Sequence, residues 1–263
     1  MAATDVSRLG FVLRPGVRRA STSSALLVCV YRLANAPVVM NLLAEARHYD
    51  WPVRLWALDE AHPDLREVTV GSGAGTKFEL VERLLGTGHP SNPDWLIVVD
   101  DDVEVTRGSL ALLLDLAARC GFAIAQAAHA PGSHWSHRIT VARPFSIARL
   151  TRFVEIGPLF VIDSAWRERF LSNAERYGMG WGLEFHWQSV GAPMGIVDLV
   201  HVKHLGAVGH DYQVEEGREQ VARESRTHGL DYETLQARSD VWRPWQRTPA
   251  WLRRVDGRGN SRD

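Results

Sequence analysis

Short apolar runs alternate with helical patterns through the first half of the chain. Apolar runs of strand length are bounded by turn residues, and helical periodicity follows them. Asn35 can cap the first helix, with Pro37 in its first turn, and Thr76 to Glu79 has the sequence of a capping box. The predicted strands span residues 25–30, 53–58, 67–70, 95–99 and 122–126. Between the last two strands we predict a helix from about Ser109 to Arg119, stopped by Gly121. This alternation predicts βαβ units in a mainly parallel, Rossmann-like sheet flanked by helices.

The second half of the chain has a different pattern of residues. Residues 128–137 contain three histidines beside Gly, Ser and Pro, which indicates a long loop. We predict further strands at 153–162 and 195–200, with a helix capped by Asp163 or Ser164 between them. Residues 212–239 are charged and helical in pattern, and three tryptophans alternate with arginines between 242 and 254. This tail predicts a contact surface, with a homo-oligomer as one possible result, although the tryptophans can equally pack back onto the domain.

These changes divide the chain into one α/β domain with appendages. We predict a loose arm at 1–24, an α/β domain at 25–210, a helical extension at 211–256 and a disordered tail at 257–263. Within the domain, residues 25–127 form one half and residues 128–210 the other.

Composition narrows the classes of function. The chain has 263 residues, with 30 basic and 31 acidic side chains, and this balance argues against a nucleic-acid partner. The apolar run at 25–30 is far too short to cross a membrane, so no transmembrane segment is expected. Two cysteines, Cys29 and Cys120, make no disulfide framework, which favours a reduced, cytoplasmic setting.

Three consecutive aspartates, Asp100 to Asp102, follow the apolar strand directly. Adjacent carboxylates repel one another, and a cation removes that cost. Carboxylate oxygens are the ligands of Mg²⁺ and Mn²⁺, and such a metal can bridge to a diphosphate. A solvated acidic turn is the simpler alternative. A haloacid-dehalogenase-type phosphatase also places aspartates after a strand. That pattern has Thr or Val where this chain has Glu104, and its strand is usually the first of the fold, which is not so here. Both departures argue against a phosphatase.

Three further segments offer candidate chemistry. The glycine-rich loop 71–75 precedes Lys77, which can meet a phosphate at the start of its helix, although a flexible turn explains the loop equally well. Trp181 offers a flat face of the kind that sugars stack on, and Glu184 can take a proton from a hydroxyl. A buried Trp with a capping Glu is the alternative. His204 or His201, beyond the last strand, can ligate a metal.

Taken in order, these segments resemble the GT-A glycosyltransferases. The similarity is closest to a glycosyltransferase-like family of plants and bacteria catalogued as a domain of unknown function, and it covers roughly residues 25 to 207. The segments that carry it are Phe122-Ala-Ile-Ala-Gln126, His137-Arg-Ile-Thr140, Phe153-Val-Glu-Ile-Gly157-Pro-Leu-Phe160, Ala165-Trp166, Gly180-Trp-Gly-Leu-Glu184, Gly195-Ile-Val-Asp198 and His204.

The resemblance implies a GT-A fold and a nucleotide-sugar donor. It implies Mn²⁺ or Mg²⁺ bound through Asp102, Asp100 near the ribose or the donor sugar, and a metal or diphosphate role for His204 in preference to His201. The family often has Asp at the position of Glu184 and Glu at that of Asp101, so this chain departs from the pattern at both.

We therefore expect a metal-dependent hexosyltransferase that inverts configuration, moving a sugar from a nucleotide-diphosphate donor to a hydroxyl acceptor with Glu184 as the catalytic base. A non-catalytic nucleotide- or sugar-binding module on the same fold is the main alternative, since fold does not fix function. We assign Trp181 and Gly182 to acceptor binding, and assign to donor binding Tyr31, Asp59, Lys77, Asp100 and Asp101. The domain at 25–210 is then the catalytic domain, with its nucleotide-sugar half at about 25–127 and its acceptor half at about 128–210.

Overall fold

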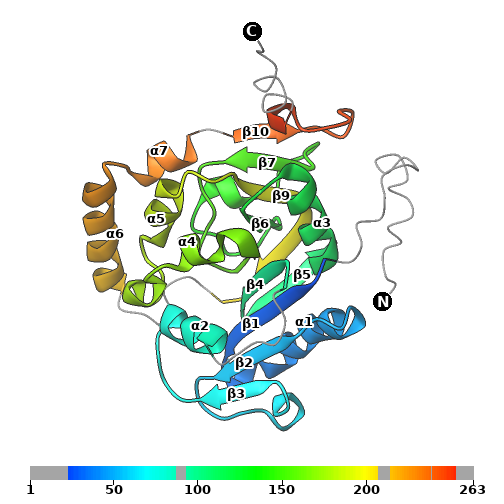
Figure 1. The fold of residues 1–263 in the computed structure, drawn as a ribbon, viewed down its shortest axis with the longest axis vertical. Helices are drawn as coiled ribbons and strands as arrows, with labels where there is room; N and C mark the ends of the chain where they lie inside the picture. Colours follow the sequence, from blue (N-terminus) through cyan, green and yellow to red (C-terminus); the bar gives the residue numbers. More distant parts are fainter. Residues whose placement is uncertain (1–22, 87–92, 207–213, 238, 253–263) are drawn as a thin grey trace.

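The computed structural model describes residues 23–86, 93–206, 214–237 and 239–252. Most of the predicted arm and all of the predicted disordered tail lie outside these ranges. Within them the chain forms a single mixed sheet with helices on both faces (Figure 1). No helix in these ranges combines the length and the apolar character that a membrane crossing requires.

Ten strands form the sheet. They are β1 Ala25–Tyr31, β2 Val53–Ala57, β3 Thr69–Ser72, β4 Trp95–Asp100, β5 Val103–Arg107, β6 Ile124–His129, β7 Ala148–Thr151, β8 Leu159–Asp163, β9 Met194–His204 and β10 Ser239–Trp242. Their order is β10-β7-β9-β6-β8-β4-β1-β2-β3, and β5 pairs with β9 off this path. The pairings make β3, β2, β1, β4, β6, β9 and β10 run one way and β5, β7 and β8 the other. The prediction of a mainly parallel sheet flanked by helices is confirmed.

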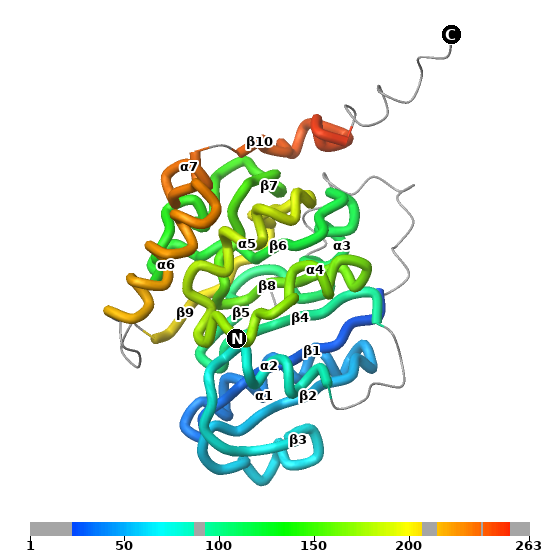
Figure 2. Tube along the Cα trace, turned by 60° about the vertical axis from the view of Figure 1, so that its left-hand side comes forward, coloured from blue at the N-terminus to red at the C-terminus, as the bar shows by residue number. Residues whose placement is uncertain are grey.

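The helices divide between the two faces of the sheet. The α-helices are α1 Ala36–His48, α2 Lys77–Gly86, α3 Leu110–Cys120, α4 Arg167–Leu171, α5 Leu183–Ser189, α6 Val214–His228 and α7 Tyr232–Gln236. Short 3₁₀ turns are η2 Leu33–Asn35, η3 Pro63–Leu65, η4 Arg138–Thr140, η5 Ser164–Trp166 and η6 Ala174–Tyr177. Helices α1 and α3 share one apolar core with the sheet, and α2, α4 and α5 share another. Figure 2 traces the course of the chain through these helices and the strands.

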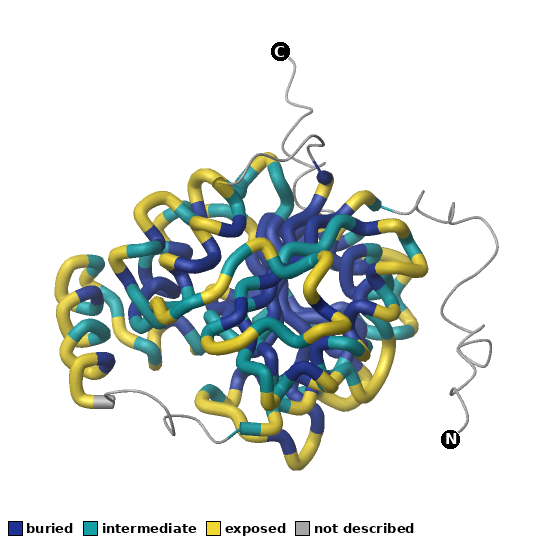
Figure 3. The backbone as a smooth tube through the Cα atoms, turned by 90° about the horizontal axis from the view of Figure 1, so that it is seen from below, coloured by how far each residue is buried: buried dark blue, intermediate teal, exposed yellow. Residues whose placement is uncertain are grey.

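Strand β1 shows why two cores form. Leu27 and Cys29 face the first core, and Leu26 and Val28 face the second, because successive side chains of a strand point to opposite faces. The apolar run predicted at 25–30 is therefore buried on both sides. Figure 3 shows these buried strands at the centre of the molecule, with exposed positions on the outer helices and loops.

Helix α3 ends where the sequence predicts. The Ser109 hydroxyl accepts a hydrogen bond from the Leu112 amide at 3.1 Å, and Gly121 closes the helix in the left-handed conformation. Asn35 does occupy the cap position of α1, but its side chain makes no capping hydrogen bond. It bonds the carboxylate of Asp101 instead. The prediction of an Asn35 cap is wrong because a partner distant in sequence takes the amide.

Two strand predictions are also wrong in extent. The strand predicted at 153–162 is β8, which begins only at Leu159, because Pro158 has no amide hydrogen for a ladder. Residues 153–157 instead run irregularly along a cavity wall. The strand predicted at 195–200 continues to His204, so both candidate histidines lie within β9.

The C-terminal extension packs on the domain. Strand β10 pairs with β7 at the edge of the sheet. Trp242 and Trp251 are buried, and the Trp251 ring stacks on Phe122 with centroids 5.9 Å apart. Trp245 is exposed. Two of the three tryptophans therefore serve the fold, and the oligomer proposed for this tail stays a prediction.

Candidate active site

A cavity of about 1070 Å³ opens at the carboxyl ends of three strands. Val30 near the end of β1, Asp100 at the end of β4 and His204 at the end of β9 lie on its wall. Open α/β sheets bind ligands at this edge, where the strands stop and side chains converge. Most of the predicted site residues line the cavity.

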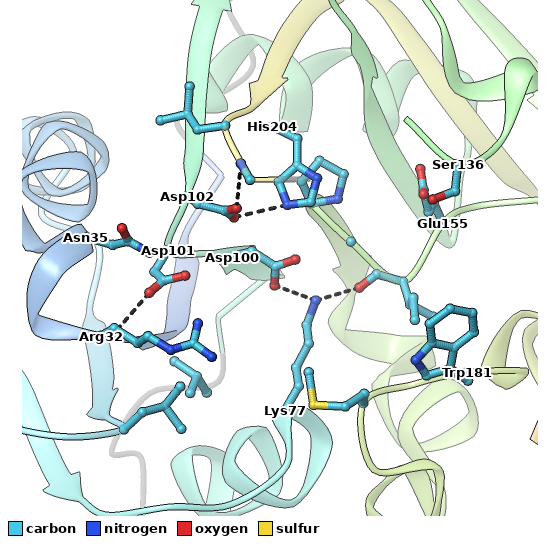
Figure 4. A pocket seen from close by; sticks show the side chains of 18 of the residues that line it. Arg32, Asn35, Lys77, Asp100, Asp101, Asp102, Ser136, Glu155, Trp181 and His204 are labelled. Atoms are coloured by element: carbon cyan, nitrogen blue, oxygen red, sulfur yellow. Dashed lines mark hydrogen bonds and ion pairs between the residues drawn. The ribbon is translucent and has the colours of Figure 1, made fainter. Parts of the chain in front are cut away.

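Strand pairing brings His204 to Asp102. Strands β5 and β9 are antiparallel, with Val103 opposite His204, so the residue before Val103 lies beside the histidine. The Asp102 Oδ1 and His204 Nε2 atoms are 3.1 Å apart, and the Gly206 amide donates to Asp102 Oδ2 at 3.0 Å (Figure 4). Asp102 and His204 are 102 positions apart in the sequence, so their contact depends on the register of β5 against β9.

The two side chains perturb each other's pKa. Burial favours the neutral form of Asp102, but the His204 hydrogen bond and charge and the Gly206 amide outweigh it, and the pKa of Asp102 is lowered. Burial likewise disfavours the charged imidazole, but Asp102 prevails and the pKa of His204 is raised. Without a cation, the two groups form an ion pair.

This pair suits a hard divalent cation. A carboxylate oxygen and an imidazole nitrogen are both accepted by Mn²⁺, and adjacent octahedral ligands at about 2.1 Å lie roughly 3 Å apart. The observed 3.1 Å between Asp102 Oδ1 and His204 Nε2 matches that spacing. Among the described residues, no three His, Cys, Asp or Glu side chains form a fuller cluster. A cation here therefore takes further oxygens from substrate and water, as Mg²⁺-type ions commonly do.

Asp100 is neutralised by Lys77. The Lys77 Nζ lies 2.5 Å from Asp100 Oδ1 and donates to the Ile156 carbonyl at 2.7 Å. An ammonium has three donors, so one is left for a ligand. Gly157 is required here, because an ideal Cβ at that position would lie 2.6 Å from the other Asp100 oxygen. The phosphate role predicted for Lys77 stays a prediction, and the lysine already holds Asp100.

Asp101 supports the loop after β1. Its carboxylate is 8% exposed and accepts from the Arg32 backbone amide at 2.7 Å and from the Asn35 side chain. Burial is the main reason that the pKa of Asp101 is raised. The aspartate borders the cavity, with its hydrogen bonds directed to the turn that starts α1. The three aspartates therefore have three different partners.

Glu184 lies at the start of α5, on the other side of the cavity. It is 2% exposed, and the Tyr232 hydroxyl donates to its Oε2 at 3.3 Å. Burial is the main cause that raises the pKa of Glu184 to about 8, and the negative charge of Glu155 adds to it. A carboxyl group with such a pKa is suited to exchanging a proton near neutral pH.

Trp181 also lines the cavity and is half-buried. Gly217 of α6 packs against one face of the indole, since an ideal Cβ there would lie 2.6 to 3.0 Å from ring atoms. A sugar therefore has only the opposite face to stack on. Gly182, with φ +86°, packs against Glu224 of α6 and lies behind the cavity wall. Contact between Gly182 and an acceptor stays a prediction.

Two of the predicted donor-binding residues lie near the cavity without forming its wall. Tyr31 is fully buried, and its hydroxyl bonds Thr69 at 3.0 Å and the His62 amide at 3.1 Å. Asp59 Oδ1 accepts from the Leu33 amide at 2.9 Å. Both side chains brace the loops that follow β1 and β2.

Several wall residues escaped sequence reasoning. Arg218 of α6 and Tyr232, the first residue of α7, come from the extension, and nothing in their neighbourhood in the sequence marks them. Glu155 lies in one of the segments that resemble the GT-A glycosyltransferases, and the sequence predicts no role for it. It is the one charged residue in an otherwise apolar stretch from Phe153 to Ile156. A lone carboxylate in a stretch predicted to be buried is a signal that would have found it. Of the two candidate histidines, His204 lies on the cavity wall. The side chain of His201 instead bonds the Asp198 carbonyl.

The fold matches known glycosyltransferases. GalNAc-T7, solved with UDP, GalNAc and Mn²⁺, aligns with a TM-score of 0.53 and 10% identity over 79% of this chain and 48% of its own. TarS of S. aureus aligns with a TM-score of 0.52 and 9% identity over 79% of this chain and 40% of its own. The chain spans about half or less of these proteins. It has the GT-A glycosyltransferase fold, as predicted.

No protein-family model matches the sequence, and a search of curated proteins found no relative. The narrower resemblance to a plant and bacterial domain of unknown function therefore stays a prediction.

Proposed function

We propose that this protein transfers a sugar from a nucleotide-diphosphate donor to a hydroxyl acceptor, with a divalent cation bound at Asp102 and His204. The observation that carries the proposal is the pairing of these two side chains, 3.1 Å apart, on the wall of the large cavity in a GT-A fold. GalNAc-T7, with the same fold, was crystallised with UDP and Mn²⁺.

The donor side of the cavity supplies charge at fixed positions. Asp102 and His204 would hold Mn²⁺ or Mg²⁺, which when bound neutralises negative charge on a leaving diphosphate. Lys77 fixes Asp100 and keeps one donor free. In our proposal Asp100 accepts from a ribose or donor-sugar hydroxyl, and Asp101 keeps the Arg32 turn in place beside it.

The acceptor half supplies a base. The acceptor oxygen attacks the anomeric carbon, the bond from that carbon to the diphosphate breaks, and the hydroxyl proton passes to Glu184. A single displacement of this kind inverts the anomeric configuration. Glu184 must be ionised to act, and the raised pKa makes it a stronger base once it is. Trp181 offers its free face to the acceptor.

A thermal-shift screen tests the donor site. Nucleoside diphosphates should raise the melting temperature with MnCl₂ present and much less without it, because a ligand that binds only the folded state stabilises it. Asp102→Asn should keep the fold and lose the metal-dependent increment. An increment that survives in Asp102→Asn would contradict the assignment. Binding without any turnover of nucleotide sugars would favour the non-catalytic module.

A further inference from the structure

Glu155 lies on the wall of the cavity as a buried carboxylate that the proposed reaction does not use. It is 9% exposed. Its backbone amide donates to Gln126 Oε1 at 2.6 Å, and its Oε2 lies 3.0 Å from His129 Nε2. Gln126 and His129 are themselves buried and come from β6, a central strand. The position of Glu155 is therefore fixed from the rigid middle of the sheet.

The histidine is fixed in turn by Ser133. His129 Nδ1 lies 3.1 Å from the Ser133 hydroxyl, which accepts from the His204 amide at 2.9 Å. A carboxylate only accepts, so His129 Nε2 carries the hydrogen toward Glu155. The Ser133 hydroxyl also lies 3.1 Å from the His134 carbonyl oxygen, so its one hydrogen serves either that oxygen or His129 Nδ1. This series of hydrogen bonds connects Glu155, through His129 and Ser133, with the His204 amide on the other side of the cavity. The side chain of Glu155 therefore has little freedom to reorient.

One oxygen of Glu155 is still available. Oε2 is taken by His129, and Oε1 has no protein partner within the described ranges. Among the described residues, Oε1 is not one of the buried polar atoms that lack a partner, so this oxygen is open to the cavity that Glu155 lines. Three buried polar side chains serve to hold this one in place, yet half of it faces the cavity without a partner. An arrangement of this kind suits a ligand that donates a hydrogen bond to Oε1.

We propose that Glu155 binds a hydroxyl of the acceptor and that the acceptor is a carbohydrate, lying between Glu155 and the free face of Trp181. His129 is the positioning residue for Glu155. This inference rests on the proposed function for its direction of transfer, while the binding site itself rests on the wall residues. Figure 4 shows Glu155 and Trp181 on the same side of the cavity, opposite Asp101 in this view.

The charges on this wall favour a neutral, hydroxyl-rich ligand. A carboxylate at Glu155 repels an anionic group placed against it. Arg218 also lines the cavity, and its guanidinium makes no ion pair within the described ranges, so it disfavours a cationic acceptor such as a lysine-rich peptide. Hydroxyls donate to carboxylates, and the apolar face of a sugar ring packs on an aromatic ring. A pyranoside meets both requirements, because it has hydroxyls that can donate to Glu155 and an apolar ring face that can pack on Trp181.

The test is direct binding of simple glycosides without any donor. Methyl glycosides of glucose, galactose, mannose and N-acetylglucosamine are titrated by ligand-observed NMR against the full chain. At least one should bind the wild type, and Glu155→Gln should weaken it by about ten- to a hundredfold, the range expected when a charge-assisted hydrogen bond is lost. Glu168→Gln, at an exposed position on α4, is the matched control and should bind as the wild type does.

Variants of His129 test the positioning role. His129→Gln keeps a donor toward Glu155 and should retain most of the glycoside affinity, whereas His129→Leu should lose it as Glu155→Gln does. His134→Leu, at an exposed position, is the control. Melting curves of each variant show whether it folds. Equal affinity in His129→Leu and the wild type would remove the positioning role.

The inference is overturned if no glycoside binds the wild type, or if Glu155→Gln binds as tightly as the wild type does. Binding of a lysine-rich peptide in place of glycosides would also overturn it. Glycoside binding that depends on Glu155 but comes without turnover of any nucleotide sugar would leave this inference standing and refute the proposed transfer. If turnover occurs and Glu155→Gln lowers kcat without raising the acceptor KM, Glu155 is a base and not a binding residue.

Discussion

Replacing Glu184 by Gln should raise stability and remove activity together. Gln keeps the size of the side chain and its hydrogen bond from Tyr232, but it does not ionise and cannot accept the proton of the acceptor hydroxyl. In the folded protein the pKa of Glu184 is about 8, against 4.5 for an ordinary Glu, because the group is buried. The folded state therefore binds this proton more tightly than the unfolded state does, and the two effects of the substitution follow from that difference.

The effect on stability depends on pH with a definite sign. Below pH 4.5 Glu184 is protonated in both states and has no effect. Between pH 4.5 and 8 the unfolded state has lost the proton and the folded state keeps it, so the free energy of unfolding falls by about 1.4 kcal/mol for each pH unit. The loss reaches at most roughly 5 kcal/mol above pH 8. Glu184→Gln removes this loss, so the variant gains most over the wild type at pH 9.

Glu184→Gln should lower the activity of the enzyme, whereas it raises the stability. At pH 7 about one tenth of the molecules have Glu184 ionised, so the transfer rate should rise roughly tenfold between pH 7 and 9. Glu184→Gln should lower kcat by roughly 10²–10⁴-fold, the usual contribution of a general base, and flatten the profile. Affinities for donor and metal should stay the same, because Asp102 and His204 are untouched.

Urea unfolding at pH 5, 7 and 9 measures the stability difference, and initial rates over the same range measure the activity. Glu168→Gln serves as the control, because an exposed Glu should show neither effect. A stability difference that is the same at pH 5 and pH 9 would refute the raised pKa. A Gln variant with near-normal kcat, or a product that keeps the donor's anomeric configuration, would make Glu184 an acceptor-binding residue.

Four further substitutions test the surroundings of the site and the packing of the C-terminal extension. His204→Ala should weaken Mn²⁺-dependent nucleotide binding in a thermal-shift titration, and His201→Ala should change it little, because His201 faces away from the cavity; the reverse ranking would show the wrong histidine was chosen. Gly206→Ala should reduce metal-dependent affinity by about tenfold, since a Cβ there collides with the Asp102 carboxylate, and unchanged affinity would contradict this. Trp251→Ala should lower the free energy of unfolding by roughly 3 kcal/mol in urea titrations while donor turnover is kept; no destabilisation would refute its packing role.

Local sequence signals predicted the elements that depend on local causes. The helix after Ser109 has its cap, its apolar face and its terminating Gly121 within thirteen residues, and all three are present. The aspartates at 100–102 follow a strand buried on both faces, so their place at the carboxyl edge of the sheet could be predicted. Such features need only propensity and periodicity.

Features that depend on distant partners were not predictable in the same way. His204 meets Asp102 through the register of β5 on β9, and neither β5 nor the full length of β9 has a clear local pattern. Asn35 has the right side chain for a cap and uses it on Asp101. The extension contributes Tyr232 to the cavity wall, and only tertiary packing can bring it there.

The most direct test of the central claim is turnover of nucleotide sugars by the full chain. Purified protein is incubated with a panel of nucleoside-diphosphate sugars and MnCl₂, with and without acceptor glycosides, and the released nucleoside diphosphate is measured. The account predicts slow release without acceptor, faster release with it, and loss of both in EDTA and in Asp102→Asn. Release that is unchanged by EDTA, or a wild type that frees phosphate from simple esters and leaves every nucleotide sugar intact, would contradict it.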